Sequence, residues 1–75
     1  MTGMKYFLAK KEKNRTAFVC GDDPGTATIG FSIDGAKEFE SPADALAFRA
    51  GMPRHWQSKF IVHEFDGSVL HSLDV

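Results

Sequence analysis

Two apolar segments open the chain, and a fully polar segment separates them. Met4–Ala9 and Thr16–Cys20 are rich in aromatic and aliphatic residues, whereas the intervening sequence KKEKNR has no apolar residue. This pattern is typical of two antiparallel strands joined by a hairpin loop. The following sequence GDDPG predicts a type II turn, because Pro24 fixes φ and Gly25 can supply the positive φ that this turn requires.

The most regular alternation of apolar and polar residues covers Ala27–Ile33 and predicts a third strand. The apolar positions expected to share one face of this strand are Ala27, Ile29, Phe31 and Ile33. Asp34–Gly35 follows as a second turn signal. A further strand pair is predicted at Lys59–Phe65 and Ser68–Leu73. Between them, Asp66–Gly67 favours a two-residue type I′ hairpin turn.

One helix is predicted between these strands, over Pro42–Ala50. Ser41 has the side chain of a helix N-cap, a proline follows it, and Asp44 places a carboxylate beside the free amides of the first turn. Gly51 is expected to end the helix in the left-handed conformation, and Pro53 excludes its continuation. A stripe of small side chains is expected to face the sheet: Ala43, Leu46, Ala47 and Ala50.

The order of predicted elements is β-β-β-α-β-β. The most economical arrangement is an α+β fold, in which an antiparallel sheet of about five strands carries one helix packed on one face. The sequence contains no repeat, linker or low-complexity segment, so residues 1–75 are expected to form a single compact domain.

Composition and charge narrow the range of functions. The chain has 75 residues and is 43% hydrophobic, and nine Lys or Arg against ten Asp or Glu give a net charge of −1. This balance argues against a nonspecific nucleic-acid-binding protein and against an acidic mimic of DNA. The single cysteine, Cys20, and the lack of an apolar leader or membrane-spanning segment indicate a cytoplasmic protein.

No motif of catalytic or metal chemistry is found in the sequence. No acid–base pair or activated nucleophile emerges, and the glycines lack a phosphate-binding spacing, so we expect no enzymatic activity and no cofactor. In the C-terminal hairpin, a two-residue turn would place His63 and His71 on opposite faces of the sheet. The two histidines could then not bind one ion, and the ligand spacings of zinc sites are absent, so we expect no metal site.

Two features are candidates for a binding surface. Arg54, His55, Trp56 and Lys59 interleave aromatic and basic side chains after the helix. They form either a contact patch for a protein or a single-stranded nucleic acid, or a segment in which Trp56 merely covers an open edge of the core. Both faces of the first strand are partly apolar, so one could be exposed to a partner. Tyr6 on this strand is either a residue at the rim of the core or the anchor of an interface.

The sequences MKYFLAKKEKNRTAFV (Met4–Val19), GAKEFES (Gly35–Ser41) and GMP (Gly51–Pro53) resemble a family of small phage-encoded anti-CRISPR proteins that act on type I-F surveillance complexes. The resemblance implies an antiparallel sheet with helices on one face and no enzymatic activity. It also implies docking on the subunits that hold the guide RNA, which blocks pairing with target DNA. Tyr6 matches a contact tyrosine of the family, whereas Cys20 replaces a second one, and the C-terminal hairpin departs from the family's helical end.

The sequence therefore favours a non-catalytic inhibitor that binds a protein complex, with Tyr6, Arg54, Trp56 and Lys59 as protein-binding residues. The alternative is a small nucleic-acid-binding module, or a cytoplasmic adaptor, that uses the Arg54–Lys59 loop. The balanced charge favours a protein over a nucleic acid as the partner. We expect no membrane partner, and we expect a monomer or a weak dimer.

Overall fold

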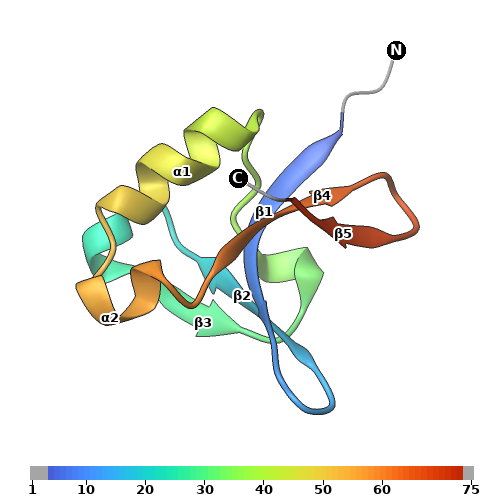
Figure 1. Ribbon diagram of the computed structural model, residues 1–75, viewed down its shortest axis with the longest axis horizontal. Coiled ribbons are helices and arrows are strands. Elements are labelled where there is room, and N and C mark those ends of the chain that lie inside the picture. The colour runs from blue at the N-terminus through green and yellow to red at the C-terminus, as the bar shows by residue number, and fades with distance from the viewer. Residues whose placement is uncertain (1–3, 74–75) are drawn as a thin grey trace.

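A five-stranded antiparallel sheet forms the centre of the computed structural model, which describes residues 4–73 (Figure 1). The strands lie in the order β3-β2-β1-β4-β5, and each neighbouring pair is antiparallel. The predicted α+β fold with five strands is confirmed, and the short second helix is an element that the sequence pattern does not predict. The elements are β1 (Lys5–Lys11), β2 (Thr16–Cys20), the 3₁₀ turn η1 (Pro24–Thr26), β3 (Thr28–Gly30), the 3₁₀ turn η2 (Ile33–Gly35), α1 (Pro42–Ala50), α2 (Arg54–Gln57), β4 (Ile61–Phe65) and β5 (Leu70–Ser72).

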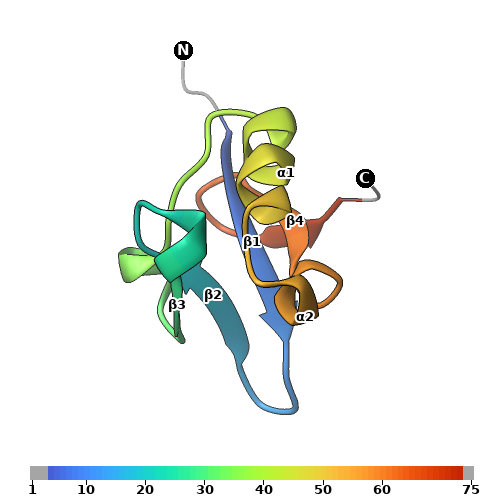
Figure 2. The same cartoon turned by 90° about the vertical axis from the view of Figure 1, so that its left-hand side faces the viewer.

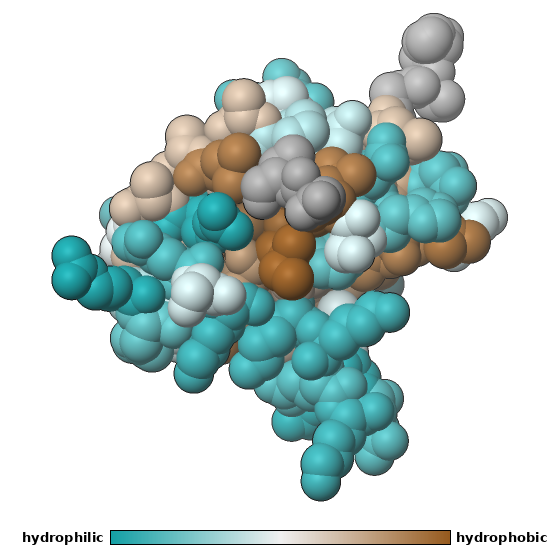
Figure 3. Space-filling model, in the orientation of Figure 1, coloured by the Kyte–Doolittle hydropathy of each residue, from teal (hydrophilic) through white to brown (hydrophobic). Residues whose placement is uncertain are grey.

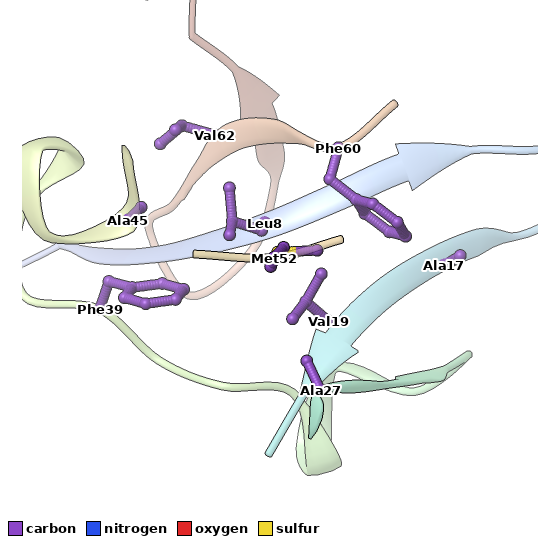
Figure 4. Close-up of a cluster of buried hydrophobic side chains, with 9 residues drawn as sticks. All are labelled: Leu8, Ala17, Val19, Ala27, Phe39, Ala45, Met52, Phe60 and Val62. Atoms are coloured by element: carbon purple, nitrogen blue, oxygen red, sulfur yellow. The ribbon is translucent and has the colours of Figure 1, made fainter. Parts of the chain in front are cut away.

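The main core, here called the helix-side core, lies between the sheet and α1 (Figure 4). Leu8, Val19 and Val62 of the three central strands are fully buried there, together with Ala45 of α1. In Figure 2, α1 and α2 follow one another along β1. The burial of these aliphatic side chains is the main favourable term that holds the helices on the sheet.

A second, smaller core occupies the other face of β1. Phe7, Ala9 and Phe18 form it, and Ile33 of η2 and Phe65 of β4 pack against it. The ring of Phe7 meets those of Phe18 and Phe65 edge to face, with centroids 6.1 and 6.2 Å apart. Both faces of β1 are therefore covered at its centre, and the expectation that one apolar face stays exposed to a partner is wrong for this part of the strand.

The start of α1 is confirmed, but the reason for its end is different from the predicted one. The Ser41 Oγ accepts a hydrogen bond from the backbone N–H of Asp44 at 3.1 Å, as an N-cap should. Gly51 has φ −92° and ψ −1°, so the predicted left-handed conformation is wrong. A Cβ at Gly51 would instead lie 2.9 Å from the Cγ of Pro24, so the position needs glycine because η1 approaches closely.

The stripe predicted to face the sheet is correct only for Leu46, which packs against the helix-side core. Ala43, Ala47 and Ala50 are exposed, and the buried residue of α1 is Ala45. Phe48 also faces the core, where its ring packs against that of Phe39 at a centroid distance of 5.2 Å. The large apolar area of the aromatic side chain therefore favours burial of this face of the helix over the face that carries the alanines.

The predicted third strand is much shorter than expected. Only Thr28–Gly30 pairs with β2, and Ile29 and Phe31 are exposed to 39% and 49%. The segment ends because the Ser32 Oγ accepts from the N–H of Asp34 and starts the turn η2. An alternating pattern on an edge strand of the sheet does not require one buried face, since few side chains cover the edge.

The preceding turn also differs from its prediction. In GDDPG the positive φ, 102°, belongs to Gly21 and not to Gly25. Pro24 and Gly25 instead form η1, whose start is capped by the Asp23 Oδ1, which accepts from the N–H of Gly25 at 2.9 Å. The type II turn is therefore wrong, because the aspartate offers the backbone a competing hydrogen bond.

The C-terminal hairpin has a longer turn than the predicted two-residue one. Phe65 pairs with Leu70, so residues 66–69 form the loop. The Asp66 Oδ1 accepts hydrogen bonds from the N–H groups of Ser68 and Val69 at 2.8 and 2.9 Å. The bond from Val69 contributes most, and that from Ser68 next, to lowering the pKa of Asp66. The pairing shifts by two residues, which preserves the faces of the strands.

Candidate binding surface

The charged side chains are divided between the two ends of β1. The hairpin segment Lys10–Arg15 carries four cations and Glu12, which gives +3, so the rest of the chain carries −4 to reach the total of −1. Carboxylates gather near the start of β1, where Tyr6 pairs with Glu64 and bridges Phe39, the residue between Glu38 and Glu40. The fold therefore has a basic end at the β1–β2 hairpin. The opposite end of the strand is acidic, because Lys5 pairs with Glu38 at 3.4 Å but Glu40 and Glu64 have no ion-pair partner within residues 4–73.

The β1–β2 hairpin projects beyond the body of the sheet (Figure 1). β1 continues to Lys11, so the segment predicted as a loop begins with two strand residues. In Figure 3 the projecting part is coloured almost entirely hydrophilic. Its tip contains an open depression of about 440 Å³, lined by Glu12, Lys13, Asn14 and Arg15.

A network of charge-assisted contacts holds the shape of this hairpin. The N–H of Glu12 donates to the carbonyl of Arg15 at 2.8 Å, and its carboxylate contacts the Lys10 Nζ and the Arg15 Nε, both at 3.3 Å. The hydrogen bond from Lys10 and then that from Arg15 hold the pKa of Glu12 below its usual value. Within residues 4–73, neither Lys11 nor Lys13 is part of an ion pair, so both remain available to an anion.

Arg15 also forms a platform with an exposed aromatic ring, that of Phe31. Its guanidinium lies 3.6 Å from the centroid of the Phe31 ring. Phe31 is 49% exposed, although a large apolar side chain is more stable when buried. The cation–π contact holds the guanidinium over the ring, and both side chains remain exposed beside the cations of the hairpin.

The segment predicted as a basic and aromatic loop forms the short helix α2. Trp56 packs against the helix-side core, and its ring meets Phe60 at a centroid distance of 6.1 Å. Gln57 ties the segment to the end of α1, because its Nε2 donates to the carbonyls of Ala50 and Met52 at 3.2 and 2.9 Å. Trp56 thus covers an edge of the core, as the second interpretation of this segment expected.

Arg54 and Lys59 remain exposed on this segment. Ile61 pairs with Ala9, so Lys59, two residues earlier, lies beside the end of β1 from which the hairpin projects. Lys59 therefore adds a cation near the basic end of the molecule.

Tyr6 lies at the other end of the helix-side core. Its backbone N–H donates to the carbonyl of Phe39 at 3.2 Å, and the N–H of Phe39 donates back at 2.8 Å. The Tyr6 ring is half-buried against the core. Phe39 and Phe60 occupy opposite ends of this core in Figure 4. The structure therefore brings Arg54, Trp56 and Lys59 together but leaves Tyr6 apart from them.

The histidine pair remains divided between the two faces of the sheet. His63 pairs with Ser72 and Glu64 pairs with His71, so the two imidazoles point to opposite sides. His63 is 2% exposed and its Nδ1 lies 2.8 Å from the carbonyl of Ile61, and burial lowers its pKa. Among residues 4–73, no group of three or more potential ligand side chains could hold a metal ion.

Sequence reasoning missed the most highly charged part of this surface. The signal was present in KKEKNR, where four of six residues are cationic, but a polar loop between strands is common and was sufficient to explain it. The sequence pattern places Phe31 on one apolar face of a strand, and the structure shows it exposed to 49%.

Comparison with known proteins gives no further guide to the function of this surface. No protein-family model matches the chain, and no curated protein or solved structure matches it significantly. Within the part of the chain that the structure describes, no helix has the length and apolar character needed to cross a membrane.

Proposed function

We propose that this protein is a non-catalytic inhibitor that acts by docking on a protein complex in the cytoplasm. The observation that supports the proposal is the separation of charge along β1. At the basic end a hairpin projects from the sheet, and the ion pairs of Glu12 with Lys10 and Arg15 stabilise its shape. Such a surface can recognise a large anionic partner without an enclosed cavity. The resemblance of Met4–Val19 and Gly35–Pro53 to anti-CRISPR proteins makes the type I-F surveillance complex the first partner to test.

Charge separation would act mainly on the encounter with the partner. A molecule with one basic and one acidic end is oriented by the field of a charged surface before contact, which raises the association rate. The ion pairs of Glu12 with Lys10 and Arg15 hold the hairpin in shape beforehand, so less conformational entropy is lost on docking. In this proposal the docked protein prevents the guide RNA of the complex from pairing with target DNA.

Co-purification tests the proposal directly. A tagged form of the protein should capture the type I-F complex and lower its binding of target DNA. If Tyr6 is an interface anchor, Tyr6→Ala should weaken capture by about 30-fold, which corresponds to about 2 kcal/mol. Ile29→Ala is the control, because Ile29 is an apolar side chain that is 39% exposed on the edge strand β3, which does not neighbour β1.

The two properties of Tyr6 must be measured together. A Tyr6→Ala variant with a much lower melting temperature would make Tyr6 a core residue, and a stable variant with full capture would exclude it from the interface. If the wild-type protein captures no complex, the assignment of this partner is wrong.

A further inference from the structure

We propose that the basic end of the molecule binds a short single strand of RNA. The contact residues are Lys11 and Lys13 of the hairpin together with the Arg15–Phe31 platform. The inference rests on the proposed function only for the choice of RNA, since a guide strand is what a docked inhibitor would meet. The binding itself follows from the geometry of the hairpin.

The lysines supply the contacts to phosphate. Four cations within the six residues of KKEKNR are offset by one carboxylate, and Glu12 already contacts Lys10 and Arg15. Lys11 and Lys13 alternate with Glu12 along the hairpin and have no ion-pair partner within residues 4–73. Phosphate groups along a strand match such a row of ammonium groups, and the release of counterions drives the association.

The platform supplies a contact to a base. The Phe31 ring is half exposed, and the Cζ of the Arg15 guanidinium lies over it, 3.6 Å from its centroid. Unpaired bases stack on aromatic rings and on guanidinium planes, and this contact requires no particular base. The open depression beside Lys13 and Asn14 leaves room for the neighbouring nucleotide.

The distribution of charge favours a short single strand over a duplex. Outside KKEKNR the chain carries −4, and the carboxylates near the start of β1 would repel a long polyanion that extended along the molecule. In a duplex the bases are stacked on one another and cannot reach the Phe31 ring. A few unpaired nucleotides at the hairpin would stay away from the carboxylates and would leave a base free to stack on the Phe31 ring.

An acidic protein is the competing class of partner, and the platform argues against it. Carboxylates would pair with the lysines, but they would gain nothing from the flat face of Phe31. A protein interface would also be expected to centre on a buried aromatic or aliphatic anchor. At the hairpin the accessible apolar group is a ring already covered on one side by a cation.

Fluorescence polarisation with a labelled oligouridine of about twelve nucleotides tests the inference, because sites on small domains cover about 4–16 nucleotides. With about three phosphates neutralised, the affinity should fall about 20-fold between about 50 and 200 mM salt. Lys11→Gln with Lys13→Gln should weaken binding about tenfold or more at low salt. Phe31→Ala should weaken it about fivefold or more through the lost stacking.

Lys5→Gln is the matched control, since it removes the same charge from the acidic end of the same strand. This variant should bind RNA like the wild type, and a thermal melt of each variant should show that the fold is intact. Binding that is insensitive to the hairpin and Phe31 substitutions in folded variants would overturn the inference. Polyglutamate that competes as well as the oligouridine would also overturn it and indicate an acidic protein, and tighter binding of oligothymidine would overturn the choice of RNA.

The result is independent of the capture experiment with the surveillance complex. RNA binding without capture would leave the inference standing and remove the proposed partner. Capture that is unaffected by the hairpin substitutions, with no RNA binding, would leave the partner and remove the inference.

Discussion

A single methyl group at Gly51 should reveal how η1 packs against the end of α1. At φ −92° an alanine is unstrained, and by itself it would stabilise the protein by about 0.4–1 kcal/mol through the lower entropy of the unfolded chain. The new Cβ would, however, meet the Cγ and Cβ of Pro24 at 2.9 and 3.2 Å. Overpacking of this kind costs about 1–3 kcal/mol.

The steric term is the larger one, so we expect Gly51→Ala to lower the free energy of unfolding by about 1 kcal/mol. For a domain of this length, the melting temperature should fall by about 4–8 °C. Alanine at position 24 would remove the Cγ at 2.9 Å and keep the Cβ at 3.2 Å, so it should relieve the closer of the two contacts. In a Pro24→Ala background, Gly51→Ala should therefore cost less than it does in the wild-type protein.

A double-mutant cycle of Gly51→Ala and Pro24→Ala, measured by urea and thermal unfolding, tests this reasoning. We expect a coupling energy of about 1 kcal/mol or more between the two positions. A left-handed glycine would instead give the same loss in both backgrounds, because the strain would lie in the backbone of Gly51 alone. A coupling energy near zero would refute the steric account.

Two further predictions concern the start of α1 and the buried histidine. Ser41→Ala should cost about 1 kcal/mol in chemical denaturation, because the N–H of Asp44 loses its capping partner. Burial lowers the pKa of His63, so below its ordinary value of 6.5 the unfolded chain binds more protons than the folded one. The free energy of unfolding should therefore be highest above this pH and should fall as the pH drops toward the lowered pKa. His63→Leu should remove this pH dependence, whereas His71→Leu should retain it. An unchanged slope of unfolding free energy against pH in His63→Leu would contradict the assignment.

Local interactions explain what the sequence predicts correctly. The N-cap at Ser41 is confirmed because the hydrogen bond joins residues only three positions apart and needs no tertiary context. The opposite faces of His63 and His71 are also confirmed, although the predicted turn is two residues too short. A shift of two residues preserves the alternation of a strand, so the conclusion tolerates an error in the loop.

Tertiary packing explains most of what the sequence does not predict. Nothing near Gly51 in the sequence indicates that Pro24 will approach it. The sequence therefore predicts a left-handed helix C-cap, which is a common local reason for a glycine at the end of a helix. The orientation of α1 depends on the contact between Phe39 and Phe48, which the small-residue stripe does not contain. The short length of β3 similarly follows from its position at the edge of the sheet and the capped turn at Ser32.

The candidate surface was only partly predictable for the same reason. The alternation of aromatic and basic residues in the sequence pointed to Lys59, which is exposed, and to Trp56, which packs against the core instead. The platform joins Arg15 and Phe31, which are distant in the sequence and meet only after β2 and β3 pair. Register between strands is needed to see that Lys59 adjoins the hairpin and that the carboxylates lie at the far end of β1.

The association rate with the type I-F surveillance complex is the most direct test of the role assigned to the basic end. In surface plasmon resonance, Lys11→Glu with Lys13→Glu should slow association about tenfold or more at low salt, and the difference should shrink as salt is added. Lys5→Glu changes a charge at the acidic end of the same strand, far from the hairpin. Its association rate should therefore stay within about twofold of the wild-type rate. Equal association rates for the hairpin variant and the wild-type protein would contradict the account.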